Sequence, residues 1–165
     1  MELKFQVQTK IQKAIGEVFD AVYNPEKLAG YFTNGGASAP LDAGTTVEWT
    51  FADTPGQTIG PFPVEVKEVV TNELIAFEWE AGSGGYNTRV EITFEETDPG
   101  ETLVKITESG WKDAEKELKD SYGNCMGWSQ MLSALKAFTE YGIDLRKGAY
   151  TEMYTPEDFE HSKKR

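Results

Sequence analysis

Two places in this sequence hold residue types that could do chemistry. Residues 123–128, GNCMGW, contain the only cysteine of the chain, Cys125, between two glycines. A thiolate nucleophile needs a neighbouring base or cation. The single histidine, His161, lies in the polar stretch EHSKKR. The sequence therefore argues against a Cys–His dyad and a histidine-rich metal site. We predict no catalytic residue, no metal site and no cofactor, and we expect Cys125 to be a small buried hydrophobe.

The second place is Glu108. It follows Val104 and Ile106 at two-residue spacing, so the alternation of a strand turns its side chain inward. An inward carboxylate could orient a ligand, or act as a general acid or base with a raised pKa. It could equally lie at a solvated rim or hydrogen-bond a backbone group. The sequence leaves these alternatives open.

The glycines of GNCMGW raise a separate question. Gly123 and Gly127 are four residues apart, so they share one face if this segment is helical. A glycine inside a helix costs about 1 kcal/mol relative to alanine, so a structural reason is expected. Close approach of the sheet or of the first helix is the expected reason. A local kink that makes room for a ligand is the alternative.

Charge and composition exclude several classes of partner. The net charge of −12 leaves no basic stripe for nucleic acid and disfavours an anionic membrane surface. No apolar run approaches the roughly 18 residues of a membrane-inserted helix. A single cysteine cannot form an internal disulfide, which favours a cytoplasmic location. The length of 165 residues suits one domain.

Alternating apolar and polar residues dominate the first two-thirds of the chain and predict an antiparallel sheet with one solvated face. Six segments follow this pattern: ELKFQVQ, TVEWTFA, PVEVKEV, LIAFEWEA, TRVEITFEE and ETLVKITES. Turn residues separate them, whereas residues 33–44 are expected to be a loop.

Two segments have helical spacing instead. A short helix is predicted over 14–23, followed by a helical turn in PEKLAGYF, and a long helix over about 113–141 that ends at Gly142. The long helix carries a wide apolar stripe that must cover the apolar face of the sheet. The sequence predicts an α+β domain, with a curved antiparallel sheet of six to seven strands wrapped around the C-terminal helix. We place this domain at residues 1–148 and a polar C-terminal tail at residues 149–165.

Several of these segments resemble a known family. Over nearly its whole length the chain resembles the START-like (SRPBCC, helix-grip) superfamily. It is most similar to the branch of that superfamily named after the activator of the heat-shock-protein-90 ATPase. The resemblance is carried by IGEVFDAVYNPEKLAGYF, LIAFEWE, VEITFEE, ITESGW and MGWSQMLSALKAFTEYGIDL. The chain departs from many relatives at Tyr31, where they carry tryptophan, and at Ala14 and Ile15, where a proline often opens the helix.

The resemblance implies a cavity between the sheet and the long helix. Members of the superfamily bind lipids, polyketides, hormones or other apolar molecules, and some modify them. We therefore expect binding of a hydrophobic or amphipathic small molecule without clear catalysis. The expected ligand-binding residues are Trp49, Phe77, Trp79, Phe94, Glu108, Trp128, Met131 and Leu135, although the aromatic residues among them could simply fill a core. The alternatives are a chaperone-associated interaction protein and, third, a cyclase-like enzyme. A homodimer is left open.

Overall fold

The computed structural model describes residues 1–163. All seven strands form one antiparallel sheet in the order β1-β7-β6-β5-β4-β3-β2. The strands are β1 (Leu3–Ile11), β2 (Gly36–Ala37), β3 (Thr46–Phe51), β4 (Ile59–Val70), β5 (Leu74–Glu80), β6 (Asn87–Asp98) and β7 (Glu101–Trp111). The helices are α1 (Ile15–Tyr23), α2 (Pro25–Ala29), α3 (Glu115–Tyr141) and the 3-10 helix η1 (Pro156–Lys163). None of the described helices is long and apolar enough to cross a membrane.

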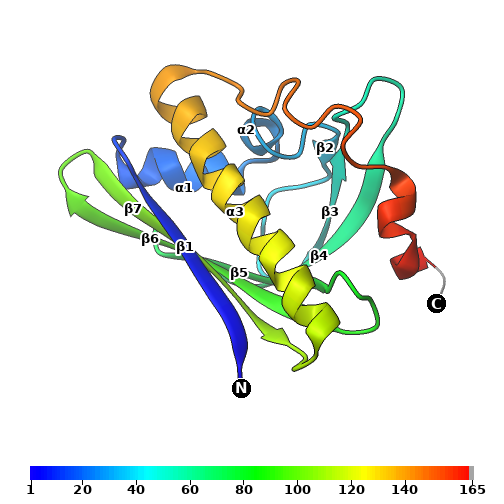
Figure 1. The fold of residues 1–165 in the computed structure, drawn as a ribbon. Helices are drawn as coiled ribbons and strands as arrows, with labels where there is room; N and C mark the ends of the chain where they lie inside the picture. The colour runs from blue at the N-terminus through cyan, green and yellow to red at the C-terminus, as the bar shows by residue number, and fades with distance from the viewer. Residues whose placement is uncertain (164–165) are drawn as a thin grey trace.

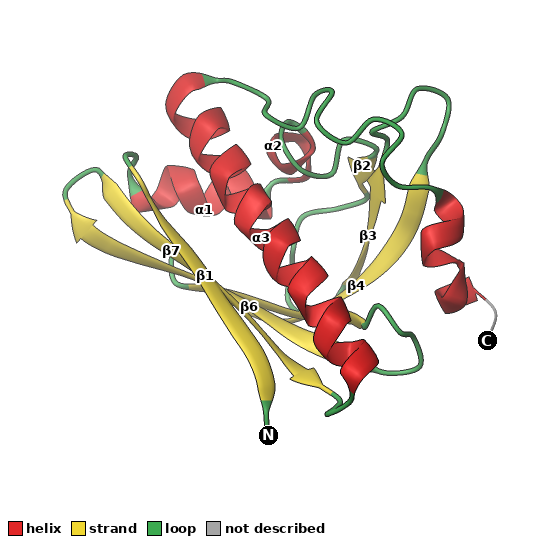
Figure 2. Ribbon diagram, in the orientation of Figure 1, coloured by secondary structure: helices red, strands yellow, loops and turns green. Residues whose placement is uncertain are grey.

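The long helix crosses the concave side of the bent sheet, as Figures 1 and 2 show. Buried α3 residues such as Trp128, Met131 and Leu135 face the sheet, because they recur at helical spacing. The helix ends at Gly142, whose positive φ of 67° lets its backbone N–H reach the carbonyls of Ala137 and Phe138. The predicted helix-grip fold is confirmed, including its terminal glycine cap.

The sheet differs from the sequence prediction at one edge. The predicted loop over 33–44 contains β2, a two-residue strand in which Gly36 pairs with Thr50 and Ala37 with Trp49. Such a strand is too short to produce an alternating pattern, so only its partner β3 was visible in the sequence. The six longer strands lie where the alternation placed them.

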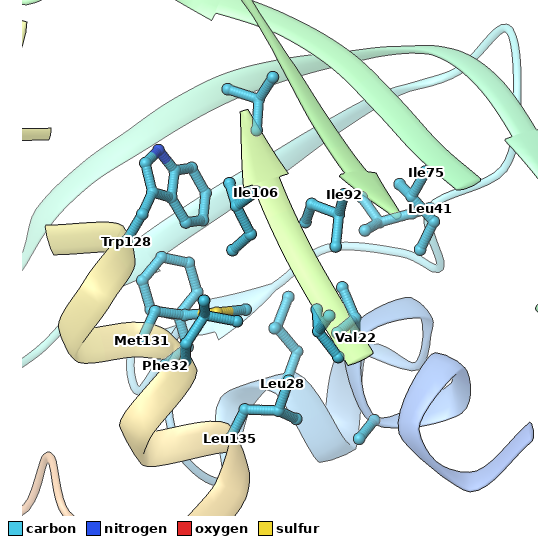
Figure 3. Packing of buried hydrophobic residues seen from close by; sticks show 14 of the residues in the cluster. Val22, Leu28, Phe32, Leu41, Ile75, Ile92, Ile106, Trp128, Met131 and Leu135 are labelled. Carbon is cyan, nitrogen blue, oxygen red and sulfur yellow. The ribbon is translucent and has the colours of Figure 1, made fainter. Parts of the chain in front are cut away.

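The interior between α3 and the sheet is filled with side chains. Figure 3 shows Trp128 and Met131 of α3 beside Phe32, with Ile106 of the sheet close by. Phe77 is fully buried in the same cluster.

The chain beyond α3 returns across the sheet. In Figure 1 this segment, coloured orange to red, runs from the top of α3 to the side of β4, where η1 lies. It approaches β3 and β4 through hydrogen bonds of Arg146 and Thr151 with Asp53. Whether residues 1–148 form a domain without the following segment stays a prediction.

Candidate functional site

A buried carboxylate joins the sheet to α3. Glu108, on β7, is fully buried, so its predicted inward direction is confirmed. Its Oε2 accepts from Thr88 Oγ1 at 2.7 Å and from Trp79 Nε1 at 3.2 Å. Its Oε1 accepts from Trp128 Nε1 at 2.8 Å, and Asn124 Nδ2 lies 3.1 Å from both oxygens. Four side chains from β5, β6 and α3 thus converge on one group.

The protonation of Glu108 is set by opposing influences. Burial raises its pKa above the usual value, and the hydrogen bonds from Thr88, Trp128, Asn124 and Trp79 act in the other direction. A carboxylate offers about four lone-pair positions, and these donors occupy them. The geometry suits a positioning role, in which the carboxylate fixes two indole rings and one amide.

The two indoles belong to a cluster of aromatic rings in tilted and edge-to-face contact. The rings of Trp79 and Trp128 have centroids 5.4 Å apart and are tilted by 38°. Phe32 lies 5.6 Å from Trp128, and Trp49 lies 5.9 Å from Trp79. Such contacts are worth about 0.5–1.5 kcal/mol each beyond simple burial. Together with Glu108, which accepts a hydrogen bond from each indole, these rings form one continuous wall.

An open groove of about 580 Å³ runs along this wall. It lies beside the first half of α3, with the strand ends of β3 to β5 as its floor and the segment after α3 on its other side. Its lining includes Phe32, Phe51, Phe62, Trp79, Gly82, Gly123, Asn124, Gly127, Trp128, Arg146, Tyr150, Tyr154 and Phe159. The volume falls in the range of roughly 300–1,000 Å³ that is typical of small-molecule sites.

The groove explains the glycines of α3. A Cβ atom built on Gly123 or on Gly127 would meet no other atom within 4 Å. The expectation that another element packs closely against these glycines is therefore wrong. Helix α3 continues through both positions and both line the groove, so their missing side chains leave helix backbone open toward the space.

Cys125 lies apart from this wall. It is half-buried and lines a shallow depression on another face of α3, with Tyr122, Ser129 and Ser133. It is not the buried hydrophobe that the sequence suggested. Helical spacing predicts that Cys125 shares the broad apolar face of the helix with Asn124 and Trp128, but of these three only Asn124 and Trp128 reach the buried carboxylate of the sheet.

The eight expected ligand-binding residues separate into three groups. Trp79 and Trp128 line the groove, and Glu108 lies behind them. Trp49 and Phe77 pack against Trp79 from the core side. The ring centroids of Trp49 and Phe77 are themselves 5.3 Å apart. The remaining three, Phe94, Met131 and Leu135, are buried in the main core cluster and do not line the groove. A ligand-binding role for the set stays a prediction.

Sequence reasoning missed the other wall of the groove. Tyr150, Tyr154 and Phe159 belong to the stretch that we took for a polar tail. Their spacing of four and five residues within YTEMYTPEDF was the available signal, and the polar residues around them masked it. Asn124 was also missed as a donor to the buried carboxylate.

Comparison with known proteins identifies the family. The family model described as Activator of Hsp90 ATPase homolog 1-like protein matches residues 14–140. The chain belongs to this family. The START-like resemblance inferred from the sequence motifs is thereby confirmed, and the matched range runs from the start of α1 to the last turn of α3.

Several solved structures share the fold of this chain. Protein SSP2350 from Staphylococcus saprophyticus is 27% identical with a TM-score of 0.71, over 88% of this chain and 97% of that one. DynU16, a putative protein in the dynemicin biosynthetic locus, is 22% identical with a TM-score of 0.70, over 88% and 50% of the chains. The Aha1 dimer from Colwellia psychrerythraea is 19% identical with a TM-score of 0.66, over 85% and 98%. No curated protein matches the sequence.

Proposed function

We propose that this protein binds a hydrophobic or amphipathic small molecule in the groove between α3 and the segment that follows it. One observation carries the proposal: an open groove of about 580 Å³ runs along two indole rings held in place by a buried carboxylate. Binding sites of this size commonly combine apolar walls with a few fixed polar groups. Here the wall is prepared before any ligand arrives, which lowers the ordering cost of binding.

The same contacts favour binding over catalysis. The oxygens of Glu108 are occupied by four donors, so they are poorly placed to take a proton from a substrate. Asp53, a carboxylate that does line the groove, is paired with Arg146 and accepts a hydrogen bond from Asn34.

Contact with a chaperone is the alternative, and the family description is what supports it. The exposed side chains of Tyr122 and Met126 on α3 offer apolar surface for such a contact or for a second copy of the chain. A cytoplasmic location, expected from the single cysteine, stays a prediction.

The proposal is tested by titrating the protein with three probes and following tryptophan fluorescence. The probes are 1-anilinonaphthalene-8-sulfonate, anthraquinone-2-sulfonate and lauric acid. We expect saturable binding of at least one probe, with a change in the emission of Trp79 and Trp128. A Gly127→Met variant should lose this binding because its side chain would occupy the groove, which lies open at that position.

A matched control places the same side chain elsewhere. Ser129→Met adds methionine to an exposed position of α3 that does not line the groove. It should bind the probe as the unmodified protein does. Absence of binding by all three probes at concentrations up to the millimolar range counts against the proposal, and equal binding by Gly127→Met places the site elsewhere.

A further inference from the structure

The segment that follows α3 is fixed to the body of the protein by a two-pronged ion pair. Arg146 Nε lies 2.8 Å from Asp53 Oδ1, and Arg146 Nη2 lies 2.9 Å from Asp53 Oδ2. The two side chains are only 16% and 7% exposed, so water screens the pair weakly. Asn34 donates a further hydrogen bond to the same carboxylate at 2.9 Å. Paired geometry of this kind fixes orientation as well as distance.

Aromatic rings enclose the arginine. Its guanidinium carbon lies 4.7 Å from the centre of the Phe51 ring and 4.8 Å from that of the Tyr150 ring. Phe51 belongs to β3, whereas Tyr150 belongs to the segment after α3. The cation thus lies between a ring of the sheet and a ring of the segment, and it holds Tyr150 at the edge of the groove.

Further contacts fix the segment along its length. Glu152 N donates to Thr54 Oγ1 at 2.8 Å, and Thr151 Oγ1 donates to the carbonyl oxygen of Asp53 at 3.3 Å. Near its end, the Phe159 ring lies 5.5 Å from the Phe62 ring of β4. These contacts give an ordered wall, and all of it lies beyond residue 140, where the match to the family model ends.

The composition of this wall indicates the class of molecule that fits. Tyr150, Tyr154 and Phe159 line the groove from the segment, and Trp79 and Trp128 line it from the body. A space lined by aromatic side chains on two sides favours a flat aromatic guest, which gains ring contacts that a flexible chain cannot make. The bare backbone at the α3 glycines leaves room for a rigid guest beside these rings.

The tyrosines add polar groups. Among the hydrogen bonds of the described residues, none involves the hydroxyl of Tyr150 or Tyr154, so both remain open to a ligand or to water. Partial burial raises the pKa of Tyr150, which keeps that hydroxyl protonated and able to donate at neutral pH. A carbonyl or hydroxyl on the rim of a flat ring would match them.

We propose that residues 146–159 form the selective wall of the groove, held by the Arg146–Asp53 pair, and that this wall favours planar aromatic ligands carrying carbonyl or hydroxyl groups over flexible aliphatic ones. The inference rests on the proposed binding function and adds to it the ligand class and the residues that set it. Arg146 acts here as a positioning residue, and the tyrosines act as contact residues.

The experiment compares anthraquinone-2-sulfonate with lauric acid, each added to displace bound 1-anilinonaphthalene-8-sulfonate. In the unmodified protein the anthraquinone should bind more tightly. The double variant Tyr150→Ala, Tyr154→Ala should weaken anthraquinone binding at least tenfold and lauric acid binding less than twofold. Arg146→Ala should do the same, because the wall loses its attachment. The control is Lys147→Ala, which removes an exposed charge at the next position. It should change the affinity for neither the anthraquinone nor lauric acid.

A second readout separates a loosened wall from a general loss of structure. Chymotrypsin should cleave after Tyr150 and Tyr154 faster in Arg146→Ala than in the unmodified protein, and mass spectrometry identifies these cleavage sites. Lys147→Ala should be cleaved at the same rate as the unmodified protein. One outcome separates the two proposals: the anthraquinone binds the unmodified protein, fails to bind Gly127→Met, and binds the wall variants with unchanged affinity. In that case the binding function stands and the selective wall is refuted. If lauric acid binds more tightly than the anthraquinone, the proposed ligand class is refuted. If no probe binds, both proposals fail.

Discussion

Trp128 Nε1 donates a hydrogen bond to Glu108 Oε1 at 2.8 Å, and this contact joins the middle of α3 to the last long strand of the sheet. Asn124, one turn earlier on α3, donates to the same carboxylate. The helix is therefore held against the sheet by directed polar contacts at the groove, and by apolar packing further along. A buried polar group fixes the positions of its hydrogen-bond partners more strictly than apolar contacts alone do.

Replacement of Glu108 by alanine should lower the free energy of unfolding by about 3 kcal/mol or more. Four donors lose their acceptor, and an unsatisfied buried donor costs about 1–3 kcal/mol. Urea denaturation followed by far-UV circular dichroism measures the change. The control is Glu95→Ala on β6, an exposed position where a change within about 0.5 kcal/mol is expected. A similar small effect at Glu108 would show that the polar cluster contributes little.

The stability contributed by Glu108 should depend on pH in a defined direction. Burial raises its pKa above the usual value of 4.5, so between that value and the raised one the folded chain binds more protons than the unfolded chain. The free energy of unfolding then falls as pH rises through this window, and the penalty is absent below it. Glu108→Gln removes the titration and leaves every other group in place.

The measurement is the difference in unfolding free energy between the unmodified protein and Glu108→Gln, from pH 4 to pH 8. We expect this difference to favour the unmodified protein more strongly at the acidic end. A difference that instead grows toward pH 8 would mean that the four hydrogen bonds outweigh burial and lower the pKa. Titration of the other carboxylates cancels in the comparison, because both proteins carry them.

Alanine at the two groove glycines should stabilise the protein. A Cβ at Gly123 or Gly127 meets no atom within 4 Å, so the usual helix preference of about 0.5–1 kcal/mol per residue should be realised. Gly30→Ala is the opposite case, because its Cβ would lie 2.7 Å from Phe138 Cε2 and should destabilise by about 1–3 kcal/mol. Thermal denaturation of the three variants checks the signs. Destabilisation at Gly123 would restore the close-packing explanation.

The fold was predictable because its signals are local. Alternation placed Glu108 on the inward face, and Gly142 marked the end of α3, since both follow from backbone geometry within a few residues. The site was predictable only in part. Trp79 and Trp128, two of the expected residues, do line the groove, but a pair such as Arg146 and Asp53, 93 residues apart, leaves no local pattern.

The glycines show a different limit. A glycine inside a helix indicates that a side chain is unfavourable at that position. Either a closely packed backbone or an open groove can be the cause, and the sequence does not distinguish them. Only the positions of surrounding atoms decide between them, and around Gly123 and Gly127 the space is empty. The aromatic residues of the segment over 149–165 were overlooked because its charged residues outnumber the three rings that line the groove.

Tyr31 gives the last test, because it stands where many relatives were expected to carry tryptophan. The structure buries it almost completely, stacks it 5.2 Å from Phe138, and directs its hydroxyl to the carbonyl oxygen of Ala21 at 2.9 Å. Tyr31→Phe keeps the ring and removes this bond, so the free energy of unfolding should fall by about 1 kcal/mol. Tyr122→Phe makes the same change on an exposed ring and should have almost no effect. Because Tyr31 does not line the groove, probe affinity should stay unchanged in Tyr31→Phe, and a loss of affinity would mean that the groove extends past Phe32 toward α1.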